Sequence, residues 1–350
     1  MNSAERFKAW KNGKPFDRMP VRHQAEKVIN DLLYDYLHVP QGDYLQLLSR
    51  LGDDFRPIYP AFIGPAEFTH VGTPEQGVYN AAIYNAAMMA SFPGRRFPLS
   101  DLASLSQIPA KYLPTADWLD YTQVSRLCEK HADDIKIAGY CDFDFINSIN
   151  MLRGQEQGFI DIALKEPVYL DLVELKYEFG MANLKKTLEA GDGRIDIVHF
   201  GDDMGTQIDL LISPSDFMSL FGEKYRQAFA LTRSYGALSM MHVCGSVRKM
   251  IPYLIDLGLD ILDVVQTNAV GMEITGLQRD FGKSIRFAGS MCVQNVLPYG
   301  KIDDVIKETK LRMELFKSGG LIFGPSHLIQ DNTPLENILA MYETIGSLTT

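Results

Sequence analysis

The chain has few cysteines, no long apolar run and no excess of basic residues, and each shortage excludes a class of protein. The four cysteines among its 350 residues are too few for a disulfide framework. No stretch approaches the roughly 20 apolar residues that a membrane span needs. The net charge is −10, and no run of Lys and Arg offsets it, so we expect no nucleic-acid or anionic-membrane surface.

The amino-terminal residues 1–20 also lack something, namely the apolar core of a signal peptide. With the sparse cysteines, this predicts a reduced, cytoplasmic enzyme of a bacterium or archaeon that acts on a small molecule. Hydrophobic residues make up 46% of the chain and charged residues 22%, a balance typical of a globular protein with a large core.

What the sequence does contain is an alternation of short β-branched or aromatic runs with longer segments of helical periodicity. The eight candidate strands are 19–23, 56–62, 135–140, 195–201, 237–244, 261–266, 285–289 and 321–325. In the helical segments, Ser215 and Asp216 are typical of a helix start, and Gly258 of a helix end just before a strand.

Eight strands that alternate with helices predict an α/β fold, a (β/α)₈ TIM barrel, as one domain over residues 1–350. The alternative is a doubly wound open sheet, which usually carries a glycine-rich GxGxxG turn after a strand. No such turn follows a candidate strand here. Residues 63–134 interrupt the alternation after the second strand, and we expect this insertion to form a lid over the barrel mouth.

In a barrel the active site lies at the carboxyl ends of the strands, so the residues that end each candidate strand are the candidate site residues. Polar or metal-binding residues stand at seven of the eight ends. In chain order they are Arg22, His23 and Gln24; Tyr140 and Cys141; Asp202, Asp203 and Gln207; His242 and Cys244; Asp263 and Gln266; Cys292; and Ser326, His327 and Gln330.

The stretch MHVCGSVR, residues 241–248, is the most informative of these ends. Side chains two residues apart on a strand share a face, so His242 and Cys244 would project together into the mouth. Imidazole and thiolate are the ligands that Zn²⁺ prefers, and a catalytic zinc takes about three protein ligands and keeps one open position. His327 is the first candidate for the third ligand and Cys292 the second. The open position could then bind a substrate thiol and lower its pKa. The alternative is a strand-end histidine bonded to a carboxylate beside an inert cysteine.

The other candidates are carboxylates and neutral hydrogen bonders. Asp202 and Asp203 could act as acid or base in the mouth, or could cap the next helix; we expect one to face the cavity and the other to be structural. His327 is a third catalytic candidate. The candidate substrate-binding residues are Gln207, Gln266, Gln330, His23 and Tyr140. Each glutamine could instead be a surface or structural residue, and His199 is expected to be a core histidine.

Four segments of the second half of the chain carry a resemblance to a known family. They are GDDMGTQIDLLISPSDF, MHVCGSVRKMIPYLIDLGLDILDVVQ, IRFAGSMCVQNVLPYGKIDDV and GGLIFGPSHLIQDNTPLENILAMYE, and their order and spacing resemble the uroporphyrinogen decarboxylase superfamily. The opening DRMPVRHQAE resembles the first strand of that family more loosely. The resemblance implies a (β/α)₈ barrel whose site lies at the carboxyl ends of the strands.

Within that superfamily the chain is more similar to the corrinoid-linked methyltransferases, of the methylcobamide:coenzyme M type, than to the true decarboxylases. The decarboxylases typically read PVWMMRQAGR in the first strand, whereas this chain has Glu26 in place of the glycine and Lys27 near the second arginine. The methyltransferases carry a zinc-binding His-x-Cys, matched here by His242 and Cys244, and a further cysteine whose position His327 occupies.

This resemblance implies a zinc-dependent methyltransferase that moves a methyl group between a methylcorrinoid, such as methylcobalamin on a partner corrinoid protein, and a small thiol or similar acceptor. The runner-up is a cofactor-free decarboxylase of tetrapyrrole metabolism, in which His327 and Asp202 or Asp203 would bind the substrate. A barrel that binds a corrinoid or tetrapyrrole without catalysis is the third alternative.

Overall fold

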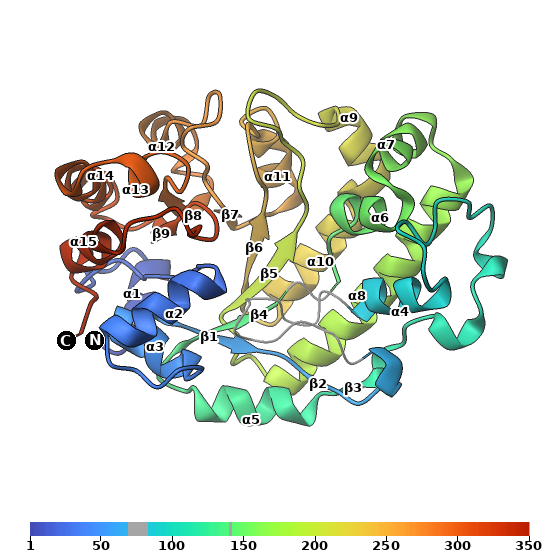
Figure 1. The fold of residues 1–350 in the computed structure, drawn as a ribbon, viewed down its shortest axis with the longest axis horizontal. Coiled ribbons are helices and arrows are strands. Elements are labelled where there is room, and N and C mark those ends of the chain that lie inside the picture. Colours follow the sequence, from blue (N-terminus) through green and yellow to red (C-terminus); the bar gives the residue numbers. More distant parts are fainter. Residues whose placement is uncertain (69–82, 140–141, 350) are drawn as a thin grey trace.

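The computed structural model describes residues 1–68, 83–139 and 142–349 (Figure 1). At its centre is a parallel sheet of seven strands in the order β1-β4-β5-β6-β7-β8-β9. The strands are β1 (Phe55–Ile58), β4 (Ile135–Ala138), β5 (Ile197–Gly201), β6 (Leu238–His242), β7 (Ile261–Asp263), β8 (Arg286–Met291) and β9 (Leu321–Pro325). The α/β class and seven of the eight predicted strands are therefore confirmed.

Helices connect successive strands of the sheet, as parallel pairing requires. They are α5 (Thr122–Lys130) after β1; α6 (Ile146–Arg153), α7 (Gln155–Leu164) and α8 (Pro167–Gly191) after β4; α9 (Pro214–Phe217) and α10 (Glu223–Ser234) after β5; α11 (Ile251–Leu257) after β6; α12 (Ile274–Phe281) after β7; and α13 (Val296–Tyr299) and α14 (Ile302–Leu315) after β8. Four further helices are α1 (Ser3–Lys11), α2 (Lys27–Tyr36) and α3 (Tyr44–Leu51) before the sheet and α15 (Leu335–Ile345) after it.

Alternate residues of each strand belong to two different apolar clusters, because side chains alternate across a strand. The larger cluster lies between the sheet and its helices and includes Val198, Phe200 and Met241. The smaller one, which we call the inner cluster, consists of Phe7, Trp10, Phe55, Ile135, Ile137, Ile197, Leu238, Met240, Ile261, Ala288 and Ile322. Phe7 and Trp10 of α1 pack on the strand residues of this cluster, and we call the side of the sheet that carries it the inner face.

The segment around Val21 joins the last strand to the first. Val21 forms a parallel bridge with Phe323 of β9, and the Arg22 amide donates to the Phe323 carbonyl over 2.9 Å. On the other side, the Asp54 amide, just before β1, donates to the Val21 carbonyl over 2.9 Å. The predicted first strand 19–23 is thus present as a single bridge rather than a ladder, and Pro20, which has no N–H, cannot extend it.

Proline also changes the second predicted strand, 56–62. The structure ends β1 at Ile58 and starts a separate strand, β2 (Ala61–Phe62), after Pro60. β2 pairs antiparallel with β3 (Leu119–Asp120), so a two-stranded sheet frames the insertion, whose described part also holds α4 (Ile83–Ser91). α5, although inside the predicted range 63–134, packs against β1 and α8 and so belongs to the layer of helices around the sheet.

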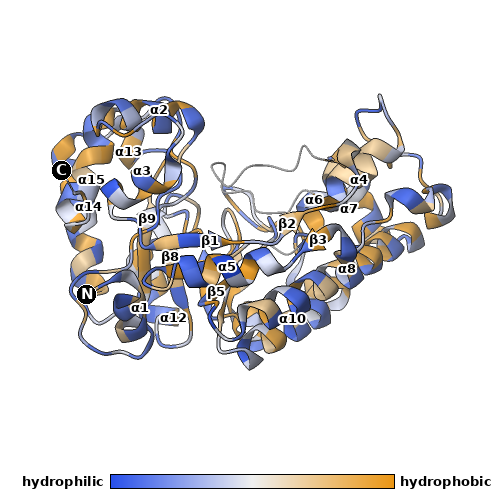
Figure 2. Ribbon diagram, turned by 90° about the horizontal axis from the view of Figure 1, so that it is seen from below, coloured by the Kyte–Doolittle hydropathy of each residue, from blue (hydrophilic) through white to orange (hydrophobic). Residues whose placement is uncertain are grey.

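Two predicted helix ends can be compared directly with the structure. Gly258 ends α11 in the left-handed conformation, with φ +97°, as the sequence predicts. The helix in segment 213–236 starts two residues earlier than predicted, because the Ser213 side chain accepts from the Asp216 amide, and a π-turn at Met218–Gly222 separates α9 from α10. Figure 2 shows that α8 and α10 carry both hydrophilic and hydrophobic residues. Among the described helices, none has the length and apolar character of a membrane span.

Candidate metal centre at the carboxyl end of the sheet

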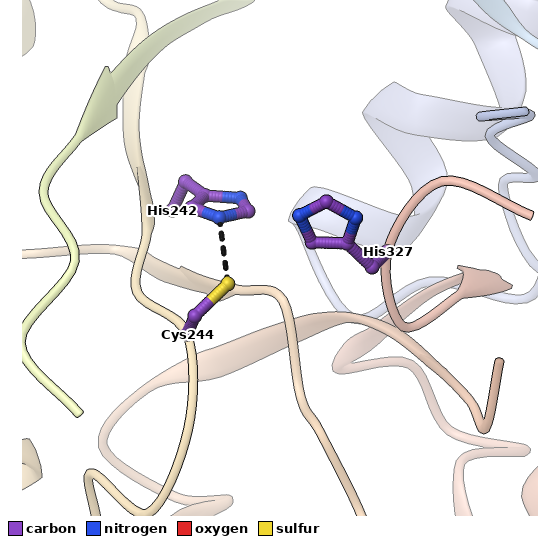
Figure 3. Close-up of side chains that lie close together, drawn as sticks. All are labelled: His242, Cys244 and His327. Carbon is purple, nitrogen blue, oxygen red and sulfur yellow. Dashed lines mark hydrogen bonds between the residues drawn. The ribbon is translucent and has the colours of Figure 1, made fainter. Parts of the chain in front are cut away.

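Three side chains that could bind a metal ion meet where β6 and β9 end. They are His242, the last residue of β6, Cys244 two residues later, and His327 two residues after β9. One ligand atom from each lies within 4.8 Å of the others, and the His242 Nε2 is hydrogen-bonded to the Cys244 Sγ at 3.0 Å (Figure 3). All three side chains are half-buried, so the group is held by the protein and still open on one side.

The chain turns sharply after Cys244, and glycine makes this turn possible. Gly245 has φ +88°, and a Cβ there would lie 2.5 Å from the Thr206 carbonyl oxygen. A left-handed conformation and this close approach both require glycine. The Gly245 amide donates to Gln266 Oε1 over 2.6 Å, which fixes the turn against the loop after β7. The backbone thereby points Cys244 back toward His242.

Asp203 adds negative charge beside this group. Its Oδ1 lies 3.5 Å from His242 Nε2 and accepts the Cys244 amide hydrogen at 3.4 Å. Burial, and then the Asp203 carboxylate, raise the pKa of the Cys244 thiol above its ordinary value. Burial lowers the pKa of His327, with nearby His242 as a second cause, which favours the neutral imidazole that binds metals.

The donor set fits zinc. Two imidazole nitrogens and one sulfur are the N/S set that Zn²⁺ prefers, and three protein ligands leave the fourth tetrahedral position for a substrate. A cation bound here would also offset the Asp203 charge that disfavours a thiolate. The chemistry and the close approach of the three residues thus agree with a catalytic rather than a structural zinc site.

A second group lies directly behind His242 and combines two of the predicted strand-end residues, Arg22 and Asp263, with His199, which was expected to be a core histidine. Asp263, the last residue of β7, has its Oδ2 2.8 Å from His199 Nε2, 3.1 Å from Arg22 Nη1 and 3.9 Å from His242 Nδ1. Burial opposes ionisation of Asp263, but Arg22 and His199 outweigh it and hold the pKa of this carboxyl below its ordinary range. Burial, and then Arg22, lower the pKa of His199 to about 4. The alternation of side chains along a strand could have predicted this group. His199, His242 and Asp263 each lie two residues beyond a member of the inner cluster and therefore share its face.

Asp202 does not join the metal-binding group. Its buried carboxylate accepts the backbone amides of Phe145, Ile146 and Asn147 at 3.1, 2.8 and 3.3 Å. It also accepts the Tyr225 hydroxyl hydrogen at 2.9 Å. Burial, and then nearby Asp144, raise the pKa of Asp202. Asp202 therefore caps the start of α6, whereas Asp203, its neighbour, faces the candidate site.

The structure distributes the remaining candidates as follows. Gln266 is buried and holds Gly245, Gln330 donates to the Leu328 carbonyl over 3.1 Å, and Gln207 is exposed on the loop after β5. Cys292 is 2% exposed and is not part of the three-donor group. Tyr140 lies outside the described residues.

His23 differs from its prediction as a substrate-binding residue, because its ring is buried in the core. Its Nδ1 lies 2.6 Å from the Tyr342 hydroxyl and its Nε2 2.9 Å from Asn30 Oδ1. On the strand-like segment 19–23, adjacent side chains face opposite ways. Arg22 faces Asp263 and the candidate site, so His23 faces α2 and α15 instead.

The burial of His23 predicts a pH-dependent stability. Burial lowers the pKa of His23 to about 4, below the value of about 6.5 in an unfolded chain. Between these two values the unfolded state binds a proton that the folded state does not, so stability falls as the pH falls. Going from pH 7 to pH 5 should cost about 2 kcal/mol through this residue. Urea unfolding at both pH values should show His23→Gln losing about 2 kcal/mol less than the unsubstituted protein.

A matched control for this measurement is His38→Asn, because His38 is exposed and adopts φ +54°, which asparagine tolerates. Its pH response should equal that of the unsubstituted protein. An equal response of the His23 variant would contradict the assignment.

Comparisons with known proteins identify the family to which this chain belongs. Residues 124–348 match the model of the family described as uroporphyrinogen decarboxylase (URO-D). Two curated relatives, methylcobamide:CoM methyltransferase MtaA of Methanosarcina barkeri and the protein of that name from strain Fusaro / DSM 804, are 24% identical over 244 and 247 residues. The match covers 69% of this chain and 64% of each relative, so the chain spans less than two thirds of their length.

The fold has a counterpart among solved structures. A methyltransferase from Methanosarcina mazei superposes with a TM-score of 0.66 at 18% sequence identity, over 99% of this chain and 98% of that one. At this identity the likeness concerns the fold, and it covers the chain nearly from end to end.

Proposed function

The chain belongs to the uroporphyrinogen decarboxylase (URO-D) family, in its methyltransferase branch, and from this premise we propose that it moves a methyl group between a methylcorrinoid and a small thiol. The observation that carries the proposal is the meeting of His242, Cys244 and His327 within 4.8 Å at the carboxyl end of the sheet. The curated relatives act on a methylcobamide and CoM by name, which supports a corrinoid as methyl donor, carried here on a partner protein.

In this proposal His242, Cys244 and His327 hold a zinc ion, which would stabilise the sulfur of the acceptor as a thiolate, its more nucleophilic form. The acceptor sulfur attacks the methyl carbon, and the cobalt–carbon bond breaks with its electron pair left on cobalt. Asp203, with its side chain 37% exposed beside His242, is suitably located to accept the proton that the thiol loses. Gln207, exposed on the loop after β5, is our proposed contact to the substrate, and Gln266 acts through Gly245.

We also propose the finer features of the fold that this function needs. Residues 19–23 would close the sheet into an eight-stranded barrel, which the hydrogen bonds of the Val21 segment to β9 and to Asp54 support. The part of the insertion 63–134 that precedes α5 would cover the mouth as a lid, within a single domain 1–350. A closed mouth would keep water from the reacting sulfur.

The test is a transfer assay on the full chain loaded with zinc. Methylcobalamin is mixed with thiols that carry a sulfonate, a carboxylate or no charged group, and the methyl thioether is measured by mass spectrometry. We expect thioether and reduced cobalamin in equal amounts with at least one thiol, and none from Cys244→Ala. Cys128→Ala is the matched control, because Cys128 is a buried cysteine on α5 outside the metal-binding group.

Two results would count against the proposal. One is the absence of thioether with every thiol at saturating methylcobalamin. The other is release of carbon dioxide from uroporphyrinogen by metal-free protein, which would support the decarboxylase alternative instead.

A further inference from the structure

The carboxylate behind His242 raises the question of what it does for the site. Asp263 Oδ2 faces the Nδ1 side of the His242 ring, whereas the Nε2 side faces Cys244. A histidine that binds a metal through one nitrogen usually presents the other to a carboxylate, a carbonyl or water, which fixes the ring and its tautomer. His242 is thus flanked by Cys244 and the Asp203 carboxylate on its Nε2 side and by the Asp263 carboxylate on its Nδ1 side.

His199, His242 and Asp263 also form a potential metal-binding group by distance alone. Charge argues against a second ion there. Arg22 Nη1 and His199 Nε2 both lie within 3.1 Å of the same Asp263 oxygen, so this oxygen already has a cationic partner and a further neighbour. A metal ion on Asp263 would sit against the Arg22 guanidinium, and repulsion between the two cations would oppose its binding.

The fold explains why these residues meet. His242 is paired in register with Asp263 on one side and with Gly201 on the other, so the ends of β5, β6 and β7 are level. His199 and Asp263 continue the inner face, on which Ile197 and Ile261 pack. Asp263 is 2% exposed and His199 3% exposed, and a buried carboxylate needs partners of this kind to remain charged.

We propose that Asp263, held by Arg22 and His199, is a positioning residue that orients His242 for zinc. With zinc bound at Nε2, His242 would carry its proton on Nδ1, and the charge of Asp263 Oδ2, 3.9 Å from Nδ1, favours that tautomer. Arg22 balances the charge of Asp263, and His199 fixes the direction of its carboxylate. This inference rests on the zinc site of the proposed function.

The test measures zinc affinity rather than activity. Asp263→Asn keeps the shape of the side chain and removes its charge, and we expect zinc to bind about 10- to 100-fold more weakly in a competition with a chromophoric chelator. The matched control is Asp260→Asn, since Asp260 lies just before β7 and its carboxylate binds the Ser239 amide at 3.0 Å. That variant should bind zinc as tightly as the unsubstituted protein.

A second variant covers the case in which Asp263→Asn alone folds poorly because Arg22 loses its partner. The double variant Arg22→Gln/Asp263→Asn removes both charges, and it should fold and still bind zinc at least 10-fold more weakly. The visible spectrum of the Co²⁺-substituted proteins gives a readout of coordination, and we expect the Asp263→Asn spectrum to keep the sulfur charge-transfer band and the band intensities of the unsubstituted protein.

Three outcomes would overturn the inference. Zinc affinity of the folded double variant within twofold of the unsubstituted protein would show that Asp263 does not position His242. A gain in ligand-field intensity in Asp263→Asn would mark a lower coordination number and make Asp263 a direct ligand. Failure of the unsubstituted protein to bind zinc would remove the proposed function as well, which separates the two failures.

Discussion

Replacing His242 or Cys244 with alanine should abolish both stoichiometric zinc binding and methyl transfer. Four-ligand protein zinc sites bind with about 10–16 kcal/mol, so one ligand contributes roughly 3 kcal/mol, or more than about 100-fold in affinity. In the proposed site each loss leaves two protein donors, 4.8 Å apart at most. We expect purified protein to contain about one zinc per chain and each variant close to none, as measured by plasma mass spectrometry after dialysis.

The same measurement identifies the third ligand. His327→Ala should lose zinc as completely as the other two variants, whereas Cys292→Ala should keep it, because Cys292 is buried outside the three-donor group. Loss of zinc from Cys292→Ala with retention in His327→Ala would assign the role to the cysteine. Retention of zinc in both single variants, His242→Ala and Cys244→Ala, would contradict the proposal of a zinc site here.

Replacing Asp202 with alanine should produce the largest loss of stability among the candidate site residues. Its carboxylate accepts three backbone amides and the Tyr225 hydroxyl, and all of these hydrogen bonds are buried except that of the Asn147 amide, which is partly buried. Without this acceptor the three amides carry a desolvation cost, whereas the Tyr225 hydroxyl keeps the Gly201 carbonyl as an acceptor at 2.7 Å, so we expect a loss of about 3–5 kcal/mol in the free energy of unfolding. Urea unfolding at pH 7 measures this difference.

The adjacent carboxylate provides the control. Asp203 is 37% exposed, so Asp203→Ala should change the free energy of unfolding by about 1 kcal/mol or less. In the transfer assay the order should reverse, and Asp203→Ala is expected to lose more activity per folded molecule than Asp202→Ala. Equal destabilisation by both variants would contradict the separation of a structural from a site-facing aspartate.

Strand alternation accounts for most of what the sequence could predict. It predicts His242 and Cys244 on one face without any knowledge of the partner strands. In the structure their side chains do meet, but β6 ends at His242 and Cys244 lies in the turn that Gly245 makes. Strand alternation also requires Asp202 and Asp203 to face opposite ways. What alternation leaves open is which of two neighbours faces inward, because that depends on packing against distant segments.

His23 shows this limit. The sequence places Arg22 and His23 together at a strand end, and only the contacts of His23 with Asn30 and Tyr342 decide that the histidine faces the helices. Asp263 shows the same limit of strand alternation. Its role depends on Arg22 and His199, which lie far from it in sequence and reach it only through the register of the sheet.

Elements with few backbone hydrogen bonds were the least predictable. The first strand contains Pro20 and is reduced to one bridge, and Pro60 divides the second. The longer strands β5, β6, β8 and β9 are buried almost throughout, and their mostly apolar sequences made them recognisable.

The donors of the metal centre leave the ribosome at different times. His242 and Cys244 are synthesised with β6, whereas His327 follows β9, the last strand of the sheet. A nascent chain that stops before β9 offers two donors, and two donors hold zinc weakly. The two apolar clusters, in contrast, contain none of the three donors. In the proposed zinc enzyme, loading of the ion would thus belong to the end of folding, and we expect zinc starvation of a cell to leave a folded but empty protein rather than an unfolded one.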